Sequence, residues 1–406
     1  MGNGMRIVIA PDKFKGCLSA DEVAEAVARG VRLACPDARM DLCPMADGGE
    51  GIVSAMVRAT GGKSVNRIVT GPLVGMKVEA PIGFLGDGST AVIEMSAASG
   101  LALLPAEQRN PFRTTTYGTG ELIRHAVQMG AKRIILGIGG SATVDGGIGC
   151  AQACGATIVF ENGTPYSSGG RRLTGADVAN VLKVQPVKAP PEKPGEEKGI
   201  VRRKAAIAAA PPSEFAHVEF VVACDVGNPL FGPEGAAPIF GPQKGATPEQ
   251  VEYLDAALHK LAQRSGRLDL ATAPGAGAAG GLGFGMMAFF GATLRSGIDI
   301  VMEATRLRKR LEGADLCLTG EGRLDSQSAA GKTAVGVARL CKEMQIPCIA
   351  IAGSIGIGAE VVHDEGINAY FSICDGPMTL EDAMKNAATL LERAASNVIR
   401  LYQSAR

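Results

Sequence analysis

The stretch Arg6-Ile7-Val8-Ile9-Ala10-Pro11-Asp12-Lys13-Phe14-Lys15-Gly16 begins as an apolar run and ends in a charged turn. Its branched residues predict a short buried strand. Behind it, Ser19-Ala20-Asp21-Glu22 has the pattern of a capping box and opens a helix to about residue 33. A second strand at 41–45 is followed by a charged loop and a helix to about residue 60. This alternation predicts an α/β unit with a parallel sheet.

The same alternation returns at the end of the chain, where the predicted elements are strands at 315–319, 347–352 and 369–373, a helix at 333–343 and a long helix from Leu380. The middle of the chain differs. Residues 65–94 read as short strands between Gly-containing turns, which is typical of antiparallel hairpins. A strand at 133–138, a Gly-rich loop, a helix and a strand ending near Phe160 predict a βαβ unit.

We therefore predict two α/β domains. Residues 1–75 and 295–406 form a discontinuous Rossmann-like domain with a parallel sheet, and residues 76–294 form an inserted mixed α/β domain. A contiguous split near residue 290 is the alternative. Residues 185–213 are rich in Pro, Glu, Lys and Ala without a sustained period, which predicts a mobile insertion without a chemical role.

The composition excludes several classes of function. Lys plus Arg number 41 and Asp plus Glu number 41, so no basic field exists to hold a nucleic acid. The apolar stretches are far shorter than the ~20 residues of a membrane span, and the first residues lack a secretory pattern, so we expect a cytoplasmic protein without a membrane partner.

The cysteines and histidines do not form a recognisable reactive pattern. The ten cysteines lack Cys-x-x-Cys spacing and are expected to be reduced and mostly buried. The four histidines are widely separated, so neither a histidine metal site nor a Ser-His-Asp relay has obvious parts. The chemistry must come from carboxylates, lysines and backbone amides.

Residues 320–333 lie between a predicted strand and a predicted helix, where free N–H groups attract phosphate. Gly331-Lys332-Thr333 resembles the end of a Walker A loop, but Ser326 stands where its first glycine is required. The alternative is a solvated turn that carries Glu321, Asp325 and Lys332. The position after a strand favours a ligand role.

Gly275-Ala276-Gly277-Ala278-Ala279-Gly280 matches the dinucleotide-binding fingerprint. The segment before it is a poor strand, and Asp299, at the distance of a ribose-binding acid, also fits a helix cap. A phosphate-facing or tightly packed loop containing Gly277 and Gly280 is therefore favoured over an NAD site.

Residues 139–147 form a Gly-rich turn that carries Ser141, Thr143 and Asp145. Backbone N–H groups and hydroxyls in such a turn are suited to holding a polyphosphate or a carboxylate. Thr143 stands where the nucleophile elbow of hydrolases requires glycine, and no histidine partner is evident, so hydrolysis is disfavoured.

Charged residues follow the first two predicted strands. Lys13 and Lys15 come after the first, and Asp47 and Glu50, in the loop that also holds Gly48 and Gly49, come after the second. In a parallel sheet both loops leave the same edge. Cations and carboxylates together suit phosphoryl transfer, in which carboxylates hold Mg²⁺ and one acid orients the attacking hydroxyl. The alternative is an ordinary surface salt-bridge cluster.

Two further charged residues lie in Gly- and Pro-containing turns of the middle segment. Asp225 follows the strand at 218–223, and Lys244 lies in Gly241-Pro242-Gln243-Lys244-Gly245. Either position is also compatible with turn chemistry alone.

Together these motifs resemble the bacterial-type glycerate kinase family over nearly the whole chain except the insertion. The pieces that carry the resemblance are residues 10–16, 45–51, 139–147, 224–226, 241–245 and 275–283, with Gly320-Glu321-Gly322, Asp325, Gln327, Gly331 and Lys332. The resemblance implies a two-domain enzyme with an active site in a cleft, which phosphorylates D-glycerate with ATP and Mg²⁺. Attachment at the 2-hydroxyl is more typical than at the 3-hydroxyl.

The resemblance and the residue types together give a set of expected roles. Lys13, Lys15 and Lys332 are expected to neutralise phosphate or carboxylate charge, and Asp47 and Asp225 to orient the hydroxyl or hold Mg²⁺. The remaining expected ligand residues are Gly48, Gly49, Glu50, Ser141, Thr143, Asp145, Lys244, Gly277, Gly280, Glu321 and Asp325. The rival hypotheses are a kinase for another hydroxy acid, an NAD-dependent oxidoreductase and a non-catalytic nucleotide-binding module.

Overall fold

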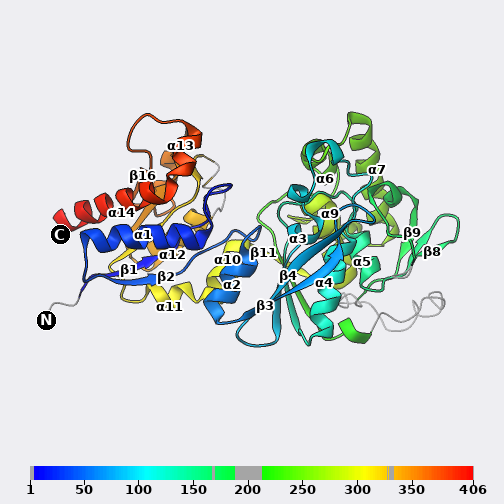
Figure 1. The fold of residues 1–406 in the computed structure, drawn as a ribbon. Coiled ribbons are helices and arrows are strands. Elements are labelled where there is room, and N and C mark those ends of the chain that lie inside the picture. The colour runs from blue at the N-terminus through cyan, green and yellow to red at the C-terminus, as the bar shows by residue number, and fades with distance from the viewer. Residues whose placement is uncertain (1–3, 167–169, 188–212, 327, 329–332, 406) are drawn as a thin grey trace. The chain divides into compact units, whose positions relative to one another are not determined.

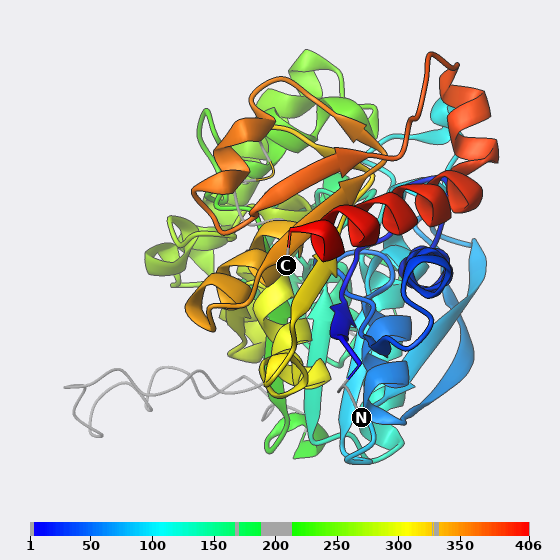
Figure 2. The same cartoon turned by 90° about the vertical axis from the view of Figure 1, so that its left-hand side faces the viewer.

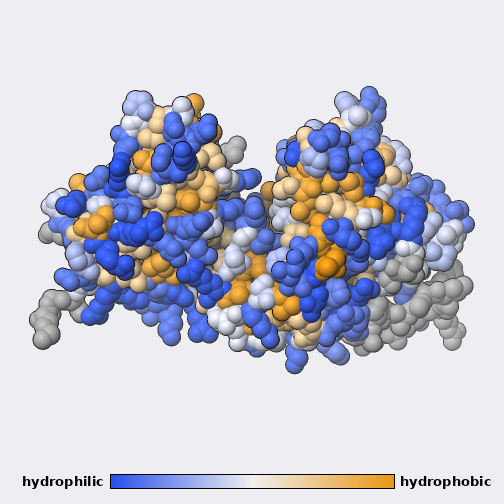
Figure 3. Space-filling view, in the orientation of Figure 1, coloured by the Kyte–Doolittle hydropathy of each residue, from blue (hydrophilic) through white to orange (hydrophobic). Residues whose placement is uncertain are grey.

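The computed structural model describes residues 4–166, 170–187, 213–326, 328 and 333–405 (Figure 1). Most of the predicted insertion, and Lys332, therefore lie outside the described residues. The chain divides into two compact units: Met1–Thr60 with Ser296–Arg406 in the first, and Gly61–Arg295 in the second. Within the described residues no helix is long and apolar enough to cross a membrane. The visible faces of both units are largely hydrophilic, with smaller apolar areas among them (Figure 3).

The first unit is built on a five-stranded parallel sheet with the order β16-β14-β12-β1-β2. Its strands are β1 (Arg6–Ile9), β2 (Arg39–Leu42), β12 (Leu316–Thr319), β14 (Cys348–Ala352) and β16 (Ala369–Ser372). The contiguous split near residue 290 would separate β1 from β12, which pair directly.

Helices cover both faces of this sheet. On one face α1 (Ala20–Ala34) and α14 (Ala387–Ser404) lie side by side (Figures 1 and 2) and pack on alternate strand residues such as Ile7 and Leu318. On the other face α12 (Thr333–Glu343) packs on β12 and β14, and α10 (Gly297–Thr305) packs on α12 and on α2 (Ile52–Thr60).

The first predicted capping box is present. The Ser19 side chain accepts a hydrogen bond from the Glu22 backbone N–H, and the Glu22 carboxylate accepts one from the Ser19 N–H. Further along α1, a β-carbon on Gly30 would lie 2.2 Å from the Glu392 carbonyl oxygen. The helix therefore begins where the sequence predicts, and Gly30 permits its close approach to α14.

The second unit contains a six-stranded mixed sheet with the order β11-β10-β6-β5-β4-β3. The first four strands in that order are parallel, and β4 pairs antiparallel with both β3 and β5. The strands are β3 (Lys63–Thr70), β4 (Lys77–Phe84), β5 (Thr90–Glu94), β6 (Arg133–Gly137), β10 (Glu219–Ala223) and β11 (Thr293–Arg295). The hairpins predicted for residues 65–94 are confirmed.

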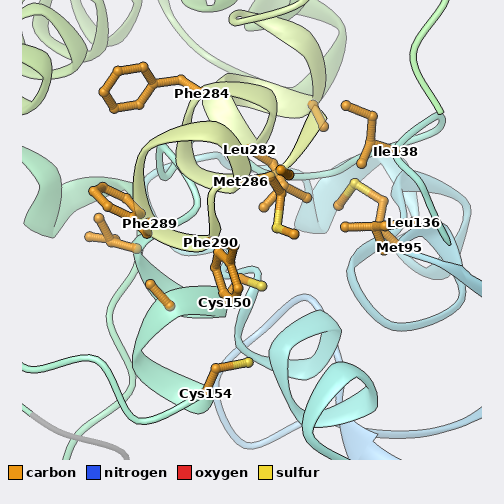
Figure 4. Close-up of a cluster of buried hydrophobic side chains, with 14 of the residues drawn as sticks. Met95, Leu136, Ile138, Cys150, Cys154, Leu282, Phe284, Met286, Phe289 and Phe290 are labelled. Carbon is orange, nitrogen blue, oxygen red and sulfur yellow. The ribbon is translucent and has the colours of Figure 1, made fainter. Parts of the chain in front are cut away.

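Apolar residues of α5 (Ile148–Ala153) and α9 (Ala278–Phe290) meet in the core of this unit. In Figure 4, Cys150 lies against Phe290, with Cys154 one turn further along. Both cysteines are fully or almost fully buried among apolar side chains. They behave as small hydrophobic residues, as the sequence predicts.

Two features of the predicted organisation are wrong. The predicted boundary of the first domain at residue 75 is too late, because the second unit begins at Gly61 and β3 pairs along its whole length with β4 within that unit. The βαβ unit predicted to end near Phe160 is also absent, because β7 (Ile158–Phe160) leaves the main sheet. It pairs antiparallel with β8 (Pro165–Tyr166) and β9 (Val181–Val184) in a separate sheet.

Candidate functional site

A cavity of about 300 Å³ lies in the first unit, beyond the carboxyl ends of β1 and β2. It is lined by residues 12–21 after β1, by residues 44–46 after β2, and by Glu50, Gly51, Ser54 and Ala55. Ligands of open parallel sheets commonly bind at this edge, because loops from neighbouring strands converge there.

Asp12 is the buried carboxylate of this cavity, with 6% of its surface exposed. Its oxygens accept hydrogen bonds from the Lys13 backbone N–H at 2.7 Å and from Thr333 Oγ1 at 2.5 Å. Burial, and then the charge of Asp47, raise the pKa of Asp12 to about 6, against the opposing effect of Lys13. A carboxylate with such a pKa accepts and releases a proton near neutral pH.

Sequence reasoning did not assign a role to Asp12, although this residue stands in the quoted stretch. The available signal was its position directly after a buried strand. Sequence alone could not show that Thr333, more than three hundred positions away, supplies a hydrogen bond to it.

The predicted charged rim forms beside Asp12. The Lys13 ammonium group donates to the Glu50 carbonyl oxygen and lies 3.8 Å from Asp47 Oδ1. The Gly49 N–H donates to the same Asp47 oxygen at 3.1 Å, and Gly48 takes a positive φ of 80° in this turn. Asp47, Glu50 and Lys15 are exposed, and Lys15 and Glu50 line the cavity. Cations and carboxylates thus share one edge of the sheet.

The loop after β12 contributes a second group of polar residues. Glu321 is 7% exposed and accepts a hydrogen bond from Ser328 Oγ at 2.7 Å. Asp325 pairs with Arg323 at 3.1 Å. Thr319, at the end of β12, donates from Oγ1 to the Ala10 carbonyl oxygen at 2.9 Å. Because Thr333 also donates to Asp12, the strand before this loop and the helix after it are both hydrogen-bonded to residues 10–12.

In the second unit, Lys244 is buried against the Gly-rich loop after β6. Only 2% of its surface is exposed, and its Nζ donates to Ser141 Oγ at 2.7 Å and to the Thr143 carbonyl oxygen at 2.8 Å. Burial lowers the pKa of Lys244 to about 7, while the charge of Asp145 opposes this shift. Lys244 forms no ion pair with any carboxylate of the described residues.

Asp145 lies behind the same loop and is completely buried. Its Oδ2 accepts from the Thr116 N–H and from Thr116 Oγ1, both at 2.8 Å, and its Oδ1 accepts from the Gly147 N–H at 3.1 Å. Burial raises the pKa of this carboxyl, and the hydrogen bonds oppose the rise. This bonding fits a structural role that fixes the loop.

The front of the loop has free donors. Gly139 and Gly140 are exposed, and their N–H groups find no acceptor within the described part of the chain. Thr143 Oγ1 is buried without a partner there. Asp225 is exposed in the loop after β10, and β10 is the parallel neighbour of β6, so both loops leave the same edge of this sheet.

Gly277 and Gly280 are buried packing positions. A β-carbon on Gly280 would lie 1.9 Å from the Thr143 carbonyl oxygen, and one on Gly277 would lie 2.1 Å from the Pro229 carbonyl oxygen. The segment that precedes them is the short helix α8 (Leu268–Ala271). A dinucleotide fingerprint requires a strand at that place, so the geometry does not favour the NAD-dependent oxidoreductase.

The Glycerate kinase family description matches residues 7–403. The chain belongs to this family. It is 45% identical to a glycerate kinase of Bacillus subtilis (strain 168), over 97% of this chain and 97% of that protein. It is 46% identical to a glycerate 2-kinase of Escherichia coli (strain K12), again over 97% of both chains.

A solved structure supports the same relationship. A crystal structure of a Salmonella typhimurium LT2 protein, provisionally described as glycerate kinase 2, superposes with a TM-score of 0.83. The two chains are 44% identical, and the match covers 99% of each. The α/β architecture with parallel sheets is therefore shared with this glycerate kinase family relative.

The donors at the first-unit cavity fit a magnesium ion. Mg²⁺ prefers oxygen ligands and commonly uses one or two carboxylates together with substrate phosphates. Asp12 and Asp47 are close enough for the charge of Asp47 to raise the pKa of Asp12, which a cation between them would reverse. Asp225, the other predicted magnesium ligand, belongs to the second unit.

Proposed function

We propose that this protein transfers the γ-phosphoryl group of ATP to D-glycerate and forms 2-phosphoglycerate. The observation that carries the proposal is membership of the glycerate kinase family over nearly the whole chain, with a relative named glycerate 2-kinase at 46% identity. We further propose that the two-segment unit is a Rossmann-like domain, that the second unit is the inserted domain, and that the protein works in the cytoplasm.

Asp12 is the proposed proton acceptor. As the glycerate hydroxyl oxygen bonds to the γ-phosphorus, the bond between that phosphorus and the β,γ-bridging oxygen breaks, and ADP leaves. The hydroxyl proton passes to Asp12, whose pKa of about 6 suits this transfer. Lys13 and Lys15 stabilise the negative charge that develops on the phosphoryl oxygens. Mg²⁺, held by Asp47 in the first unit, would supply further positive charge.

The loop at residues 139–141 is the proposed oxyanion site of the second unit. Lys244 donates to the Ser141 hydroxyl oxygen, so the hydroxyl hydrogen is left to donate outward beside the N–H groups of Gly139 and Gly140. Consecutive N–H groups in such a turn form an anion-binding concavity. The buried charge of Lys244 behind them has no carboxylate within ion-pairing distance among the described residues, and an oxyanion would compensate it.

The remaining predicted site residues keep supporting roles in this proposal. Gly277 and Gly280 let the backbone pack against the oxyanion loop, and Asp145 fixes that loop from behind. Gly48, Gly49, Glu50, Glu321 and Asp325 position the loops of the first unit.

Proton-coupled phosphorus NMR tests the reaction. The protein is incubated with D-glycerate and MgATP, and the new phosphomonoester signal is examined. A doublet means attachment at the secondary 2-hydroxyl, as proposed. A triplet would place the phosphoryl group on the 3-hydroxyl, and intact ATP in the presence of folded protein would exclude glycerate as the substrate.

Lys244→Met tests the oxyanion site. Methionine matches the length of the buried stem but carries no charge. We expect the Kd of either D-glycerate or a non-hydrolysable ATP analogue, measured separately by calorimetry, to rise by about tenfold or more. The ligand whose Kd rises identifies the oxyanion. Lys260→Met, at a partly exposed lysine that pairs with Glu161, is the matched control. Unchanged affinity for both ligands would overturn the site.

A further inference from the structure

Three cysteines from two strands and the helix between them converge in the first unit. Cys317 lies on β12, Cys341 on α12 and Cys348 on β14, and all three are completely buried. Cys317 and Cys348 are register partners on neighbouring strands, so both face the helix that carries Cys341. Their three Sγ atoms lie within 4.8 Å of one another.

This arrangement differs from ordinary burial of cysteine in a core. Cys150 and Cys154 form only a pair and lie among apolar side chains (Figure 4). In the trio, every Sγ atom lies within 4.8 Å of both others. Each sulfur therefore has two sulfur neighbours, and three potential thiolate ligands surround one point.

The geometry constrains the ion that could lie at that point. Metal–thiolate bonds are about 2.3 Å long, so three sulfurs in a plane around one ion are separated by about 4 Å. The observed upper limit of 4.8 Å requires each sulfur to move by only a fraction of an ångström. No fourth His, Cys, Asp or Glu ligand joins the group within the described residues. A structural zinc site normally needs four ligands, whereas soft thiolates select Cu(I).

We infer that Cys317, Cys341 and Cys348 form a buried three-thiolate site for Cu(I). Binding replaces S–H bonds by S–Cu bonds and releases the thiol protons to solvent. The copper enters and remains as Cu(I), so no electron is transferred. Because all three sulfurs are buried, uptake requires local opening of α12 and is expected to be slow.

The position of the trio gives the site a consequence that rests on the proposed function. Cys317 lies two residues before Thr319, which bonds to the Ala10 carbonyl oxygen. Cys341 lies on the helix that begins at Thr333, which bonds to Asp12. Contraction of the three sulfurs around an ion would shift both connections. Cu(I) is therefore expected to inhibit phosphoryl transfer.

The test is an anaerobic competition between the protein and a coloured Cu(I) chelator such as bathocuproine disulfonate. All proteins carry Cys374→Ser, because Cys374 is the exposed thiol. We expect the parent to remove one equivalent of Cu(I) from the chelator, and Cys150→Ala to do the same. Cys341→Ala and Cys348→Ala, checked for folding by circular dichroism, should bind Cu(I) about tenfold more weakly or worse.

Failure of the parent to compete would overturn the site, and so would equal Cu(I) affinity in Cys341→Ala. These outcomes do not depend on turnover, so they are separate from any failure of the proposed function. Turnover with and without one equivalent of Cu(I) is measured afterwards. Binding without inhibition would retain the site and overturn its coupling to Asp12.

Discussion

Replacing Asp12 by asparagine should make the protein more stable and nearly inactive. Asparagine has the same shape, and it can keep both observed hydrogen bonds. Its oxygen can accept from the Lys13 N–H, and its amide can donate to Thr333 Oγ1. The substitution therefore removes the buried charge without removing the contacts that position the side chain.

The size of the stability effect follows from the pKa. The pKa of Asp12 is raised from 3.8 to about 6, and each unit is equivalent to about 1.36 kcal/mol. Because the pKa of Asp12 is raised in the folded protein, protonation of this carboxyl contributes to the stability of the fold. That contribution is complete below pH 3.8 and is lost as the pH rises through 6. At pH 7, Asp12→Asn should therefore increase the free energy of unfolding by up to about 3 kcal/mol, and near pH 4 the gain should vanish.

Urea unfolding followed by circular dichroism at both pH values measures this effect, with the transition of the first unit fitted separately. Asp145→Asn is the control. It should destabilise the second unit by about 1–3 kcal/mol, because an amide cannot accept all the hydrogen bonds made to that carboxylate. In a coupled ADP-release assay Asp12→Asn should lower kcat by about a hundredfold or more. Destabilisation at pH 7, or near-normal turnover, would refute the reasoning.

Three further substitutions test other parts of the structure. Thr143→Val should raise the free energy of unfolding by about 1 kcal/mol, because it removes a buried hydroxyl without a partner in the described residues; a lower midpoint in urea would contradict this. Gly280→Ala should destabilise the second unit by about 2 kcal/mol or more, since its φ is 67° and its β-carbon would meet the Thr143 carbonyl, whereas Gly227→Ala, in open space, should leave the melting temperature unchanged. Asp225→Asn should lower kcat by about a hundredfold if that carboxylate touches the metal or the hydroxyl, and near-normal turnover would remove Asp225 from the site.

The sequence predicted the elements of the first unit well because local signals agree there. The run before Asp12 and the capping box at Ser19 specify a strand and a helix start without help from distant contacts. The signals failed where pairing decides the outcome. The hairpins of residues 65–94 were predicted, but nothing within residues 63–70 shows that this strand belongs to the second unit, and nothing near Phe160 shows that β7 pairs in a separate sheet.

In the candidate site, too, local features could be predicted from the sequence and distant contacts could not. Charged residues after β1 and β2 were predictable, since the carboxyl ends of parallel strands meet at one edge. The contacts of Asp12 with Thr333 and of Lys244 with Ser141 could not be predicted. Each of them joins segments separated by more than a hundred residues. The cysteine trio was missed because the spacing of its members matches no metal motif.

The buried charged side chains can be separated by how completely their hydrogen-bonding capacity is used. Asp145 accepts from backbone and hydroxyl donors, and Asp177 accepts from both guanidinium nitrogens of Arg171, so both are explained by structure. Within the described part of the chain Lys244 donates only to neutral oxygens, and burial shifts its pKa downward, as it shifts that of Asp12 upward. Burying a charge without full compensation costs stability, and such a cost is tolerated where a ligand later supplies the missing interaction. Asp12 and Lys244 are therefore the two positions where removing the charge should cost more in activity than in folding.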